Sequence, residues 1–308
     1  MKIFVTGVGG QLGHDVVNEA VSRGYEAVGS DLAPQYSGVA DGSAVTSAPY
    51  VQLDITDGAA VSAVIGAQRP DVIVHCAAWT AVDAAEEPEN RAKVHAINAE
   101  GTRNIAAVAR SVDAKMVYLS TDYVFDGQGT EPWDPDCISY SPLNVYGRSK
   151  LDGELAVREL LDKYFIVRIA WVFGLNGKNF IKTMLQVGKT HDTVCVVNDQ
   201  IGTPTYTLDL ARLLVDMVGT DRYGTYHATN AETEPGGYIS WYDFTVEIYR
   251  QAGLATKIVP VTTAEYGLSK AARPFNSRLD KQKLVREGFT PLPDWKDALA
   301  RYLREITE

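Results

Sequence analysis

A glycine-rich segment follows the first predicted strand and opens the first predicted helix. Residues 6–13 read TGVGGQLG, directly after an apolar run at residues 3–6. The glycines at 7, 10 and 13 have the spacing G-x-x-G-x-x-G, a variant of the dinucleotide-binding fingerprint. Such glycines permit a tight turn, let the backbone approach a pyrophosphate and bring helix and strand close together. The alternative is a β–α turn without a ligand, but four glycines in seven residues weaken a helix start without other use. We predict cofactor contacts at Gly7, Gly10, Gln11, Leu12 and Gly13.

Strand-like and helix-like segments alternate through the first half of the chain. This alternation predicts a parallel sheet covered on both faces, an α/β fold of the Rossmann-type, doubly wound kind. Beyond residue 170 the pattern becomes irregular and rich in glycine, proline and aromatic residues. We therefore predict an NAD(P)-binding domain at 1–170 and a smaller C-terminal substrate lobe at 171–308. The boundary is soft, because segments of the lobe can return to the main sheet. The predicted strands are 3–6, 27–30, 51–53, 72–75, 116–120 and 165–169, and the predicted helices are 11–23, 59–65 and 92–111.

Acidic residues follow the second and third predicted strands, where the adenosine half of a dinucleotide would lie. Asp31 closes the second strand and is placed to accept hydrogen bonds from the ribose hydroxyls. That would favour NADH, because the 2′-phosphate of NADPH would meet the carboxylate. The alternative is a solvated turn residue ahead of Pro34. Asp54 and Ile55 follow the third strand and are predicted to border the adenine.

Composition and charge exclude several classes of protein. The chain has 308 residues, 45% hydrophobic and 22% charged, as is typical of a soluble protein with a core. Its formal net charge is −10 and it has no dense lysine or arginine run, which argues against nucleic-acid binding. No apolar run approaches the roughly 18 residues of a membrane span, and the first residues lack a signal-peptide pattern, so we expect a cytoplasmic protein. Cys76, Cys137 and Cys195 are too scattered for a disulfide framework or a metal site.

A tyrosine and a lysine four residues apart provide the candidate catalytic pair. Tyr146 and Lys150 would lie on one face of a helix. Reduction of a ketone needs a proton for the oxygen, and a lysine cation lowers the pKa of a nearby tyrosine. The same spacing occurs at Tyr266 and Lys270, so spacing alone is not specific. Only the first pair follows the strand 116–120, at whose carboxyl end ligands bind in doubly wound sheets, and we predict that the second is coincidental.

Several segments together resemble the extended short-chain dehydrogenase/reductase family. The glycine loop, the segment STDYVF at 120–125 and the segment NVYGRSK at 144–150 carry this resemblance. Within that family, further motifs resemble the dTDP-4-dehydrorhamnose reductase subgroup and are more specific than the glycine loop. The resemblance spans nearly the whole chain. The further motifs lie at 77–83, 171–173, 179–184, 199–205 and 273–277.

The resemblance implies a reaction and a set of residue roles. The reaction is NAD(P)H-dependent reduction of the C4 ketone of dTDP-4-dehydro-L-rhamnose to dTDP-L-rhamnose. Thr121 would hydrogen-bond the substrate carbonyl, Tyr146 would donate the proton, and Lys150 would tune Tyr146 and bind the nicotinamide ribose. Lys182 and Arg273 would be the cations for a diphosphate. Further cofactor contacts are implied at Ala77, Ala78 and Thr80, and substrate contacts at Val82, Thr121, Asp122, Trp171, Asn179, Lys182, Gln200 and Arg273.

Two departures from the subgroup leave properties open. The stretch 33–49, rich in serine, glycine and alanine, looks like an insertion beside the adenosine site, so the choice between NADPH and NADH stays open. Some members of the subgroup bind Mg²⁺ through glutamates at a dimer interface. This chain has Asp15 and, one turn on, Glu19 near its first helix, so no metal site is predicted, and a monomer and a homodimer both remain open.

Neighbouring functions remain as alternatives. Other nucleotide-sugar reductases and epimerases use the same scaffold. Dehydratases need a glutamate after the Thr-Asp pair, and this chain has Tyr123 there, which argues against dehydration. A non-catalytic alternative is a regulatory subunit of the methionine adenosyltransferase type, which keeps the fold and the nucleotide site.

Overall fold

Seven parallel strands form the central sheet of the computed structural model, which describes residues 1–36, 46–234 and 236–307. Their order along the sheet is β11-β6-β5-β4-β1-β2-β3. The chain runs outward in one direction from β1 and in the other from β4, so the strand order reverses between these two. In such sheets, ligands bind outside the carboxyl ends of the strands at this reversal. The strands are β1 (Lys2–Thr6), β2 (Glu26–Asp31), β3 (Tyr50–Gln52), β4 (Val72–His75), β5 (Lys115–Thr121), β6 (Tyr164–Ile169) and β11 (Gly224–His227).

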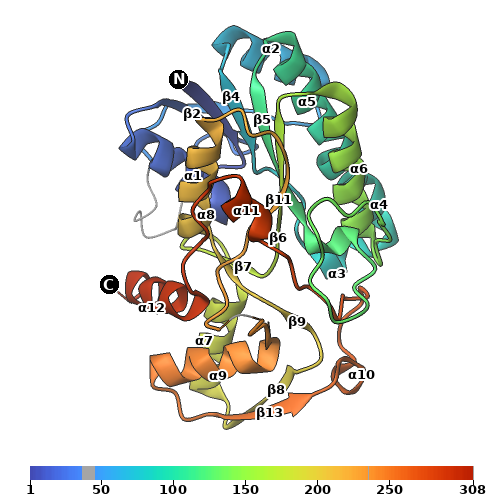
Figure 1. Ribbon diagram of the computed structural model, residues 1–308, viewed down its shortest axis with the longest axis vertical. Helices are drawn as coiled ribbons and strands as arrows, with labels where there is room; N and C mark the ends of the chain where they lie inside the picture. Colours follow the sequence, from blue (N-terminus) through green and yellow to red (C-terminus); the bar gives the residue numbers. More distant parts are fainter. Residues whose placement is uncertain (37–45, 235, 308) are drawn as a thin grey trace.

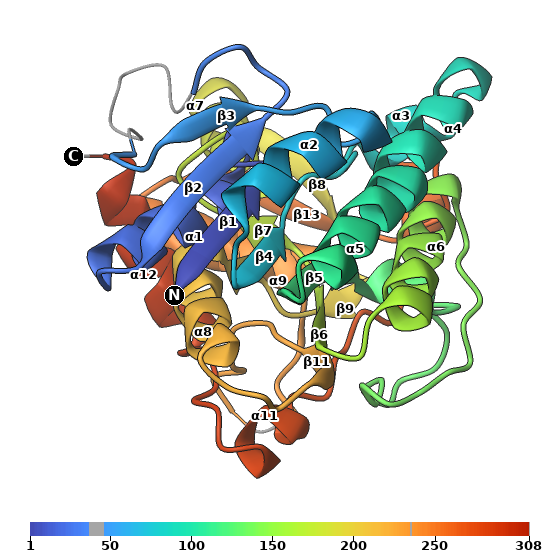
Figure 2. The same cartoon turned by 90° about the horizontal axis from the view of Figure 1, so that it is seen from above.

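Helices cover both faces of the sheet (Figure 2). One face is covered by α1 (Gln11–Ser22) and α8 (Thr207–Val218), which pack against each other. The other is covered by α2 (Gly58–Gln68), α5 (Gly101–Ser111) and α6 (Val145–Leu160). Because both faces are buried, the inner strands are apolar almost throughout, as parallel sheets require.

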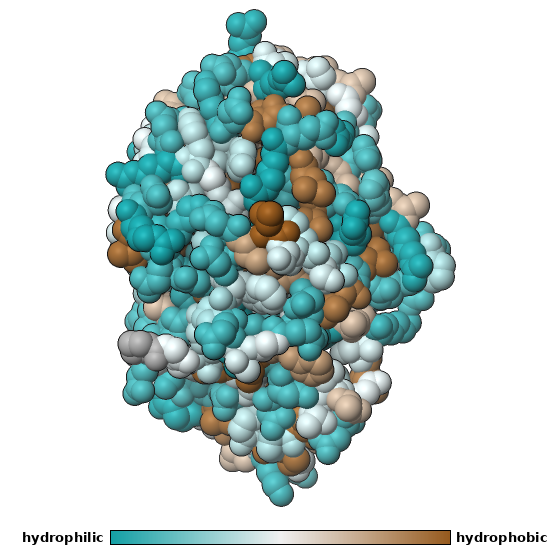
Figure 3. Space-filling view, turned by 45° about the vertical axis from the view of Figure 1, so that its right-hand side comes forward, coloured by the Kyte–Doolittle hydropathy of each residue, from teal (hydrophilic) through white to brown (hydrophobic). Residues whose placement is uncertain are grey.

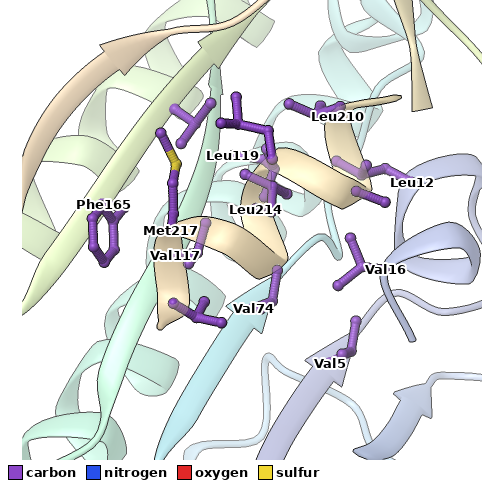
Figure 4. Packing of buried hydrophobic residues seen from close by; sticks show 14 of the residues in the cluster. Val5, Leu12, Val16, Val74, Val117, Leu119, Phe165, Leu210, Leu214 and Met217 are labelled. Carbon is purple, nitrogen blue, oxygen red and sulfur yellow. The ribbon is translucent and has the colours of Figure 1, made fainter. Parts of the chain in front are cut away.

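The core between the sheet and α1 and α8 joins the two halves of the sequence. In Figure 4, Leu12 and Val16 of α1 and Leu214 of α8 lie over Val5 and Val74 of the sheet. A separate core fills the opposite face of the sheet under α2, α5 and α6. The strands are therefore held from both sides by side chains with little or no exposure.

A smaller lobe lies below the carboxyl ends of the strands in the view of Figure 1. Its core is largely aromatic, with Phe173, Phe244 and Trp295 among the buried members. It contains α7 (Phe180–Thr190), β8 (Thr193–Val197), α9 (Trp241–Ala252), β13 (Lys257–Val261) and α12 (Trp295–Glu305). The short elements of the chain are α3 (Val82–Ala85), α4 (Pro88–His95), β7 (Val172–Phe173), β9 (Ile201–Gly202), β10 (Thr205–Tyr206), β12 (Ile239–Ser240), α10 (Thr263–Tyr266) and α11 (Gln282–Arg286).

The doubly wound fold predicted from the sequence is confirmed, with two refinements. β11 lies beyond residue 170 and pairs in parallel with β6, so the main sheet draws on both parts of the chain. The predicted helix at 92–111 consists of α4, a π-helical turn at Ala96–Glu100, and α5. The division into domains at residue 170 stays a prediction. Residues 37–45 of the predicted insertion at 33–49 lie outside the described residues.

The described part of the chain contains no helix suited to a membrane. On the face drawn in Figure 3, hydrophilic residues predominate and hydrophobic ones form small patches between them. Within the described ranges, each helix is too short or too polar to cross a bilayer.

Candidate active site

Two adjoining pockets lie at the carboxyl ends of the central strands. The first, of about 510 Å³, runs from the glycine loop past the ends of β2 and β3. The second, of about 430 Å³, runs from the same loop past the end of β5 to the smaller lobe. Both are lined by Gly7, Gly10, Cys76 and Ala78, so the glycine loop is their junction. One elongated ligand could therefore occupy the first pocket and reach into the second.

The glycine loop brings the main chain close to this junction. Gly7 has φ +73°, and a Cβ there would lie 2.5 Å from the amide nitrogen of Ala77. A Cβ on Gly13 would lie 2.2 Å from the Gly7 oxygen, so close contact between helix and strand requires glycine. Gly10 is the N-cap of α1, makes no side-chain capping hydrogen bond, and is followed by no acidic residue in the first turn. The amides of that turn are thus available to an anion.

The first pocket has the acidic end that the sequence predicted. One Asp31 oxygen accepts a hydrogen bond from the Gly9 amide at 2.8 Å, which fixes the carboxylate beside the glycine loop. Asp31, Asp54 and Ile55 all line the pocket. The three residues predicted to border the adenosine therefore line one pocket.

A nicotinamide dinucleotide fits this pair of pockets. The uncapped start of α1 suits the pyrophosphate, and the first pocket suits the adenosine. The second pocket contains the buried hydroxyl of Ser120, which has no hydrogen-bond partner within the described part of the chain. An unpaired buried hydroxyl is costly, and a ligand group in this pocket would pair it. Among residues 1–36, 46–234 and 236–307, no group of three or more histidine, cysteine or acidic residues could hold a metal ion.

Local structure at the start of α6 places the candidate catalytic pair. Asn144 is the N-cap, and its side chain accepts a hydrogen bond from the Gly147 amide at 2.7 Å. A Cβ on Gly147 would lie 2.3 Å from the Tyr123 oxygen, so this glycine lets α6 approach the end of β5. Tyr146 therefore lies in the first turn beside that strand, with Lys150 one turn further on, and both line the second pocket.

Burial shifts the pKa values of the pair in opposite directions. It raises the pKa of the Tyr146 phenol, and a hydrogen bond with Thr121 opposes this rise. It lowers the pKa of the Lys150 ammonium to about 7, and the nearby Glu154 carboxylate opposes this fall. The Lys150 nitrogen also lies 4.3 Å from the centre of the Tyr118 ring. A lysine with this pKa carries only part of its charge at neutral pH, so its predicted effect on Tyr146 stays a prediction.

The predicted carbonyl contact, Thr121, belongs to a buried hydrogen-bond chain. Its hydroxyl donates to Asp122 at 3.0 Å and accepts from the Tyr123 amide at 3.2 Å. The other Asp122 carboxylate oxygen accepts from the Ser277 hydroxyl at 2.5 Å. Burial raises the pKa of Asp122 to about 6, and the hydrogen bonds from Ser277 and Thr121 oppose the rise.

The second Tyr-Lys pair lies elsewhere. Tyr266 ends the short helix α10 and is exposed. Lys270 is exposed and forms an ion pair with Glu87. Within the described residues, neither side chain lines the two pockets.

The structure brings most of the predicted site residues together. The first pocket contains seven of the predicted cofactor contacts, Gly7, Gly10, Asp31, Asp54, Ile55, Ala77 and Ala78. The second contains the remaining cofactor contacts, the catalytic residues and part of the substrate set: Gln11, Leu12, Gly13, Thr80, Val82, Thr121, Asp122, Tyr146, Lys150 and Trp171.

Four predicted substrate contacts lie outside the lining of both pockets, as far as the described residues define it: Asn179, Lys182, Gln200 and Arg273. Asn179 caps α7 and donates to Tyr302 at 2.8 Å. Gln200 donates to the Thr263 hydroxyl at 3.0 Å. Their binding role stays a prediction.

The two predicted diphosphate cations already have protein partners. Lys182 donates to the carbonyl oxygens of Leu175 at 2.5 Å and Gly177 at 3.0 Å. Arg273 donates to the Asp83 carboxylate at 2.6 Å. Contact with a diphosphate would have to compete with these bonds.

Other residues of the site carry no signal in the sequence. Lys178 and Trp241 line the second pocket, and Lys93 lines the first. The Trp241 ring stacks on Trp171 with 3.9 Å between ring centres. Lys178 lines this pocket together with Gly7 and Gly10, but nothing in the sequence distinguishes it from other loop lysines.

Asn98, in the π-helical turn, is a further residue that the sequence did not single out. Its side chain accepts from the Trp79 amide at 2.8 Å and donates to the Ser149 hydroxyl at 2.9 Å. Ser149 in turn donates to the Tyr146 carbonyl oxygen at 2.8 Å. Asn98 thus connects the loop 77–83 to the first turn of α6.

Comparison with known protein families relates the whole chain to one of them. The family described as RmlD substrate binding domain matches residues 1–308. The chain belongs to this family. Membership in the RmlD substrate binding domain family confirms the resemblance drawn from the motifs.

Individual relatives agree with this assignment. A dTDP-4-dehydrorhamnose reductase from Streptomyces griseus is 43% identical, over 84% of this chain and 84% of its own. A dTDP-4-keto-6-deoxy-D-glucose reductase from Streptomyces niveus is 37% identical, over 97% of this chain and 95% of its own. The crystal structure of a dTDP-4-dehydrorhamnose reductase from Bacillus anthracis in complex with NADP is 39% identical, with a TM-score of 0.86 over 99% of both chains.

Proposed function

We propose that this chain reduces the C4 ketone of dTDP-4-dehydro-L-rhamnose to dTDP-L-rhamnose, with NADPH or NADH as the reductant. The observation that carries the proposal is the convergence of Thr121, Tyr146 and Lys150 in the second pocket, beside the glycine loop that it shares with the first. Relatives named for this reaction match most of the chain. The chain is accordingly an oxidoreductase of the nucleotide-sugar type.

Each residue of the pocket has a defined task in such a reduction. The dinucleotide, when bound, supplies a hydride for the carbonyl carbon. Tyr146 holds the proton that the carbonyl oxygen must receive, and Thr121 lines the same pocket, where its hydroxyl can bond that oxygen. Lys150, when protonated, places positive charge next to the developing oxyanion. The walls of the pocket hold donor and acceptor in line, which removes much of the entropic cost of bringing them together.

The test is oxidation of the nicotinamide cofactor with enzymatically prepared dTDP-4-dehydro-L-rhamnose. We expect rapid oxidation of NADPH or NADH by the wild-type chain and at least a hundredfold lower turnover by Tyr146→Phe, because proton donation is lost. Tyr266→Phe is the matched control and should retain wild-type turnover. Cofactor binding by Tyr146→Phe, followed by fluorescence, should persist. Wild-type-like turnover in Tyr146→Phe would contradict the mechanism.

A second substrate is favoured by one relative. The Streptomyces niveus protein is named for dTDP-4-keto-6-deoxy-D-glucose, which carries a ketone at the same carbon. The same assay with that sugar ranks the two substrates by kcat/KM. Failure of both, with nucleotide binding intact, would favour another nucleotide-sugar reductase, an epimerase or the regulatory-subunit alternative.

Three further properties belong to this proposal. We propose that the protein is cytoplasmic. We propose a monomer or a homodimer, which light scattering at two concentrations distinguishes. The requirement for Mg²⁺ stays open and no site is assigned to it, because Asp15 is buried against α8 beside Thr207; turnover in the presence of a chelator tests the requirement.

A further inference from the structure

Lys178 differs from the other basic residues of the two pockets. Within the described residues, the basic side chains that line the pockets are those of Lys93, Lys150 and Lys178. Lys93 lies over the Trp79 ring, 5.7 Å from its centre, and Lys150 is buried in the same pocket as Tyr146. Lys178 is exposed and forms no ion pair or hydrogen bond with any other described residue. Its charge is therefore available to a ligand in the second pocket.

The loop that carries Lys178 is attached to the glycine loop on both sides of this lysine. Before it, the buried side chain of Asn176 donates to the Gly9 carbonyl oxygen at 2.9 Å. After it, the side chain of Asn179 donates to the side-chain oxygen of Gln11 at 3.1 Å. Lys178 therefore extends from a backbone that is fixed next to the first turn of α1.

Lys182 holds the same loop from within. Its ammonium group donates to the carbonyl oxygens of Leu175 at 2.5 Å and Gly177 at 3.0 Å. Gly177 has φ +72°, and a Cβ there would lie 3.7 Å from the side chain of Gln11, so the loop passes close to α1. The contacts of Lys182 thus support the loop, and the exposed charge in the pocket belongs to Lys178.

The start of α1 offers amide donors in the pocket that Lys178 lines. The Gly10 amide donates to the Gly7 carbonyl oxygen at 3.0 Å. The amides of Gln11 and Leu12 follow in the first turn, where a helix provides no acceptor of its own. This end of a helix is positive and binds phosphate groups. A diphosphate held by these amides would have Lys178 within the same pocket.

We propose that Lys178 binds a diphosphate at the start of α1, and that this is the diphosphate of the dinucleotide cofactor. The inference deepens the proposed reduction and rests on it for the identity of the cofactor. The attachment of the loop to the glycine loop favours the cofactor over the sugar nucleotide, whose sugar must reach Tyr146. The cofactor would then contact both parts of the chain, the glycine loop after β1 and the loop after β7.

Lys178→Gln is the first test, with the dissociation constants of NADH and NADPH measured by protein fluorescence. We expect about tenfold weaker binding, because a charge-assisted hydrogen bond to a phosphate oxygen is lost. Lys178→Arg retains the charge and should bind within about threefold of wild type. Lys189→Gln, which removes an exposed lysine near the other end of α7, is the matched control and should bind as the wild type does. Wild-type affinity in Lys178→Gln would overturn the proposal.

Two further ligands separate the two diphosphates. ADP-ribose carries the diphosphate of the cofactor without the nicotinamide, and dTDP carries that of the sugar nucleotide. In calorimetric titrations, Lys178→Gln should weaken the binding of ADP-ribose about as much as that of NADH and leave that of dTDP unchanged. Weaker binding of dTDP alone would assign the lysine to the sugar nucleotide and overturn the assignment to the cofactor. Equal losses for both ligands would overturn it as well, since the lysine would not distinguish them.

A double-mutant cycle tests the support of the loop by Lys182. Lys182→Met should weaken NADH binding through the position of Lys178, so the double variant should bind little more weakly than Lys178→Gln alone. If the two losses multiply, the lysines act independently and Lys182 does not act through the loop.

These binding measurements do not depend on turnover. If no keto-sugar is reduced but Lys178→Gln weakens the binding of NADH and ADP-ribose, the proposed reaction fails and the diphosphate site stands. If the keto-sugar is reduced and Lys178→Gln binds NADH as tightly as wild type, the diphosphate site fails alone.

Discussion

The site contains a lysine enclosed by apolar groups and one aromatic face. Lys150 is 4% exposed, lies over the Tyr118 ring and has its pKa lowered to about 7. The unfolded chain binds this proton more readily, so between about pH 7 and the usual range of lysine the unfolded state carries more protons. Stability then rises with pH across this window, and the full penalty is present below it.

Replacement of this residue should therefore stabilise the cofactor-free protein while removing its activity. We expect Lys150→Met to raise the melting temperature at pH 7 by several degrees, since about 1 kcal/mol corresponds to about 2 °C in a chain of this size. The gain should shrink towards pH 10, where the wild-type lysine is neutral in both states. Scanning calorimetry at both pH values measures this, with Lys189→Met, an exposed lysine on α7, as the control. A lower melting temperature than wild type at pH 7 would contradict the argument.

Sequence reasoning predicted single residues well where a short motif fixes the local geometry. Tyr146 was predicted because it lies at the start of a helix and Thr121 because it lies at the end of a strand, and both line the second pocket. Lys182 and Arg273 were predicted from the family resemblance and from their charge, and both have partners within the protein. The bond from Ser277 to Asp122 spans 155 positions, and no local pattern indicates it.

At the scale of elements, α6 is joined to β6 by a buried ion pair. Arg168 donates two hydrogen bonds of 2.8 Å to Glu154, and both side chains are fully buried. The pair lies one helical turn beyond Lys150. A carboxylate at this depth is tolerated because the guanidinium satisfies both of its oxygens.

Breaking this ion pair should make the protein less stable. We expect Glu154→Gln to lower the free energy of unfolding by about 3–5 kcal/mol, because the Arg168 charge would remain buried without its partner. Urea denaturation followed by circular dichroism measures the loss. Glu159 lies on the same helix, is exposed and pairs with Arg103, so Glu159→Gln should change the free energy of unfolding little. Equal stability of the two variants would show that the buried pair is not the stabilising one.

The order of the elements was predicted more accurately than their boundaries. The strand predicted at 72–75 is found unchanged as β4, because a short, fully buried apolar run has clear ends. The helix predicted at 92–111 is interrupted by the turn at Ala96–Glu100. Hydrophobic periodicity does not report which backbone groups pair along a helix, so it could not predict that interruption. For the same reason it could not predict the hydrogen bonds of Asn98 with Trp79 and Ser149.

For the whole molecule, the two parts of the chain are connected through the sheet and through the site. β11 and α8 come from beyond residue 170, yet they complete the sheet and one of its covering layers. From the same part, Asn176 donates to the Gly9 carbonyl oxygen at 2.9 Å. Pairing between strands so far apart in the sequence has no local signal, so only the possibility of returning segments could be inferred.

A chain that ends at residue 170 should therefore not fold on its own. It would leave β6 as an open edge and would expose the core that Leu210, Leu214 and Met217 of α8 now cover. We expect residues 1–170 to lack a cooperative thermal transition and to bind no NADPH. Coexpression with residues 171–308 should restore both, because the interface between the fragments is the core itself. A cooperative transition with NADPH binding by residues 1–170 alone would instead show that the first part is an independent domain, and that α8 and β11 only cover a sheet that is already stable.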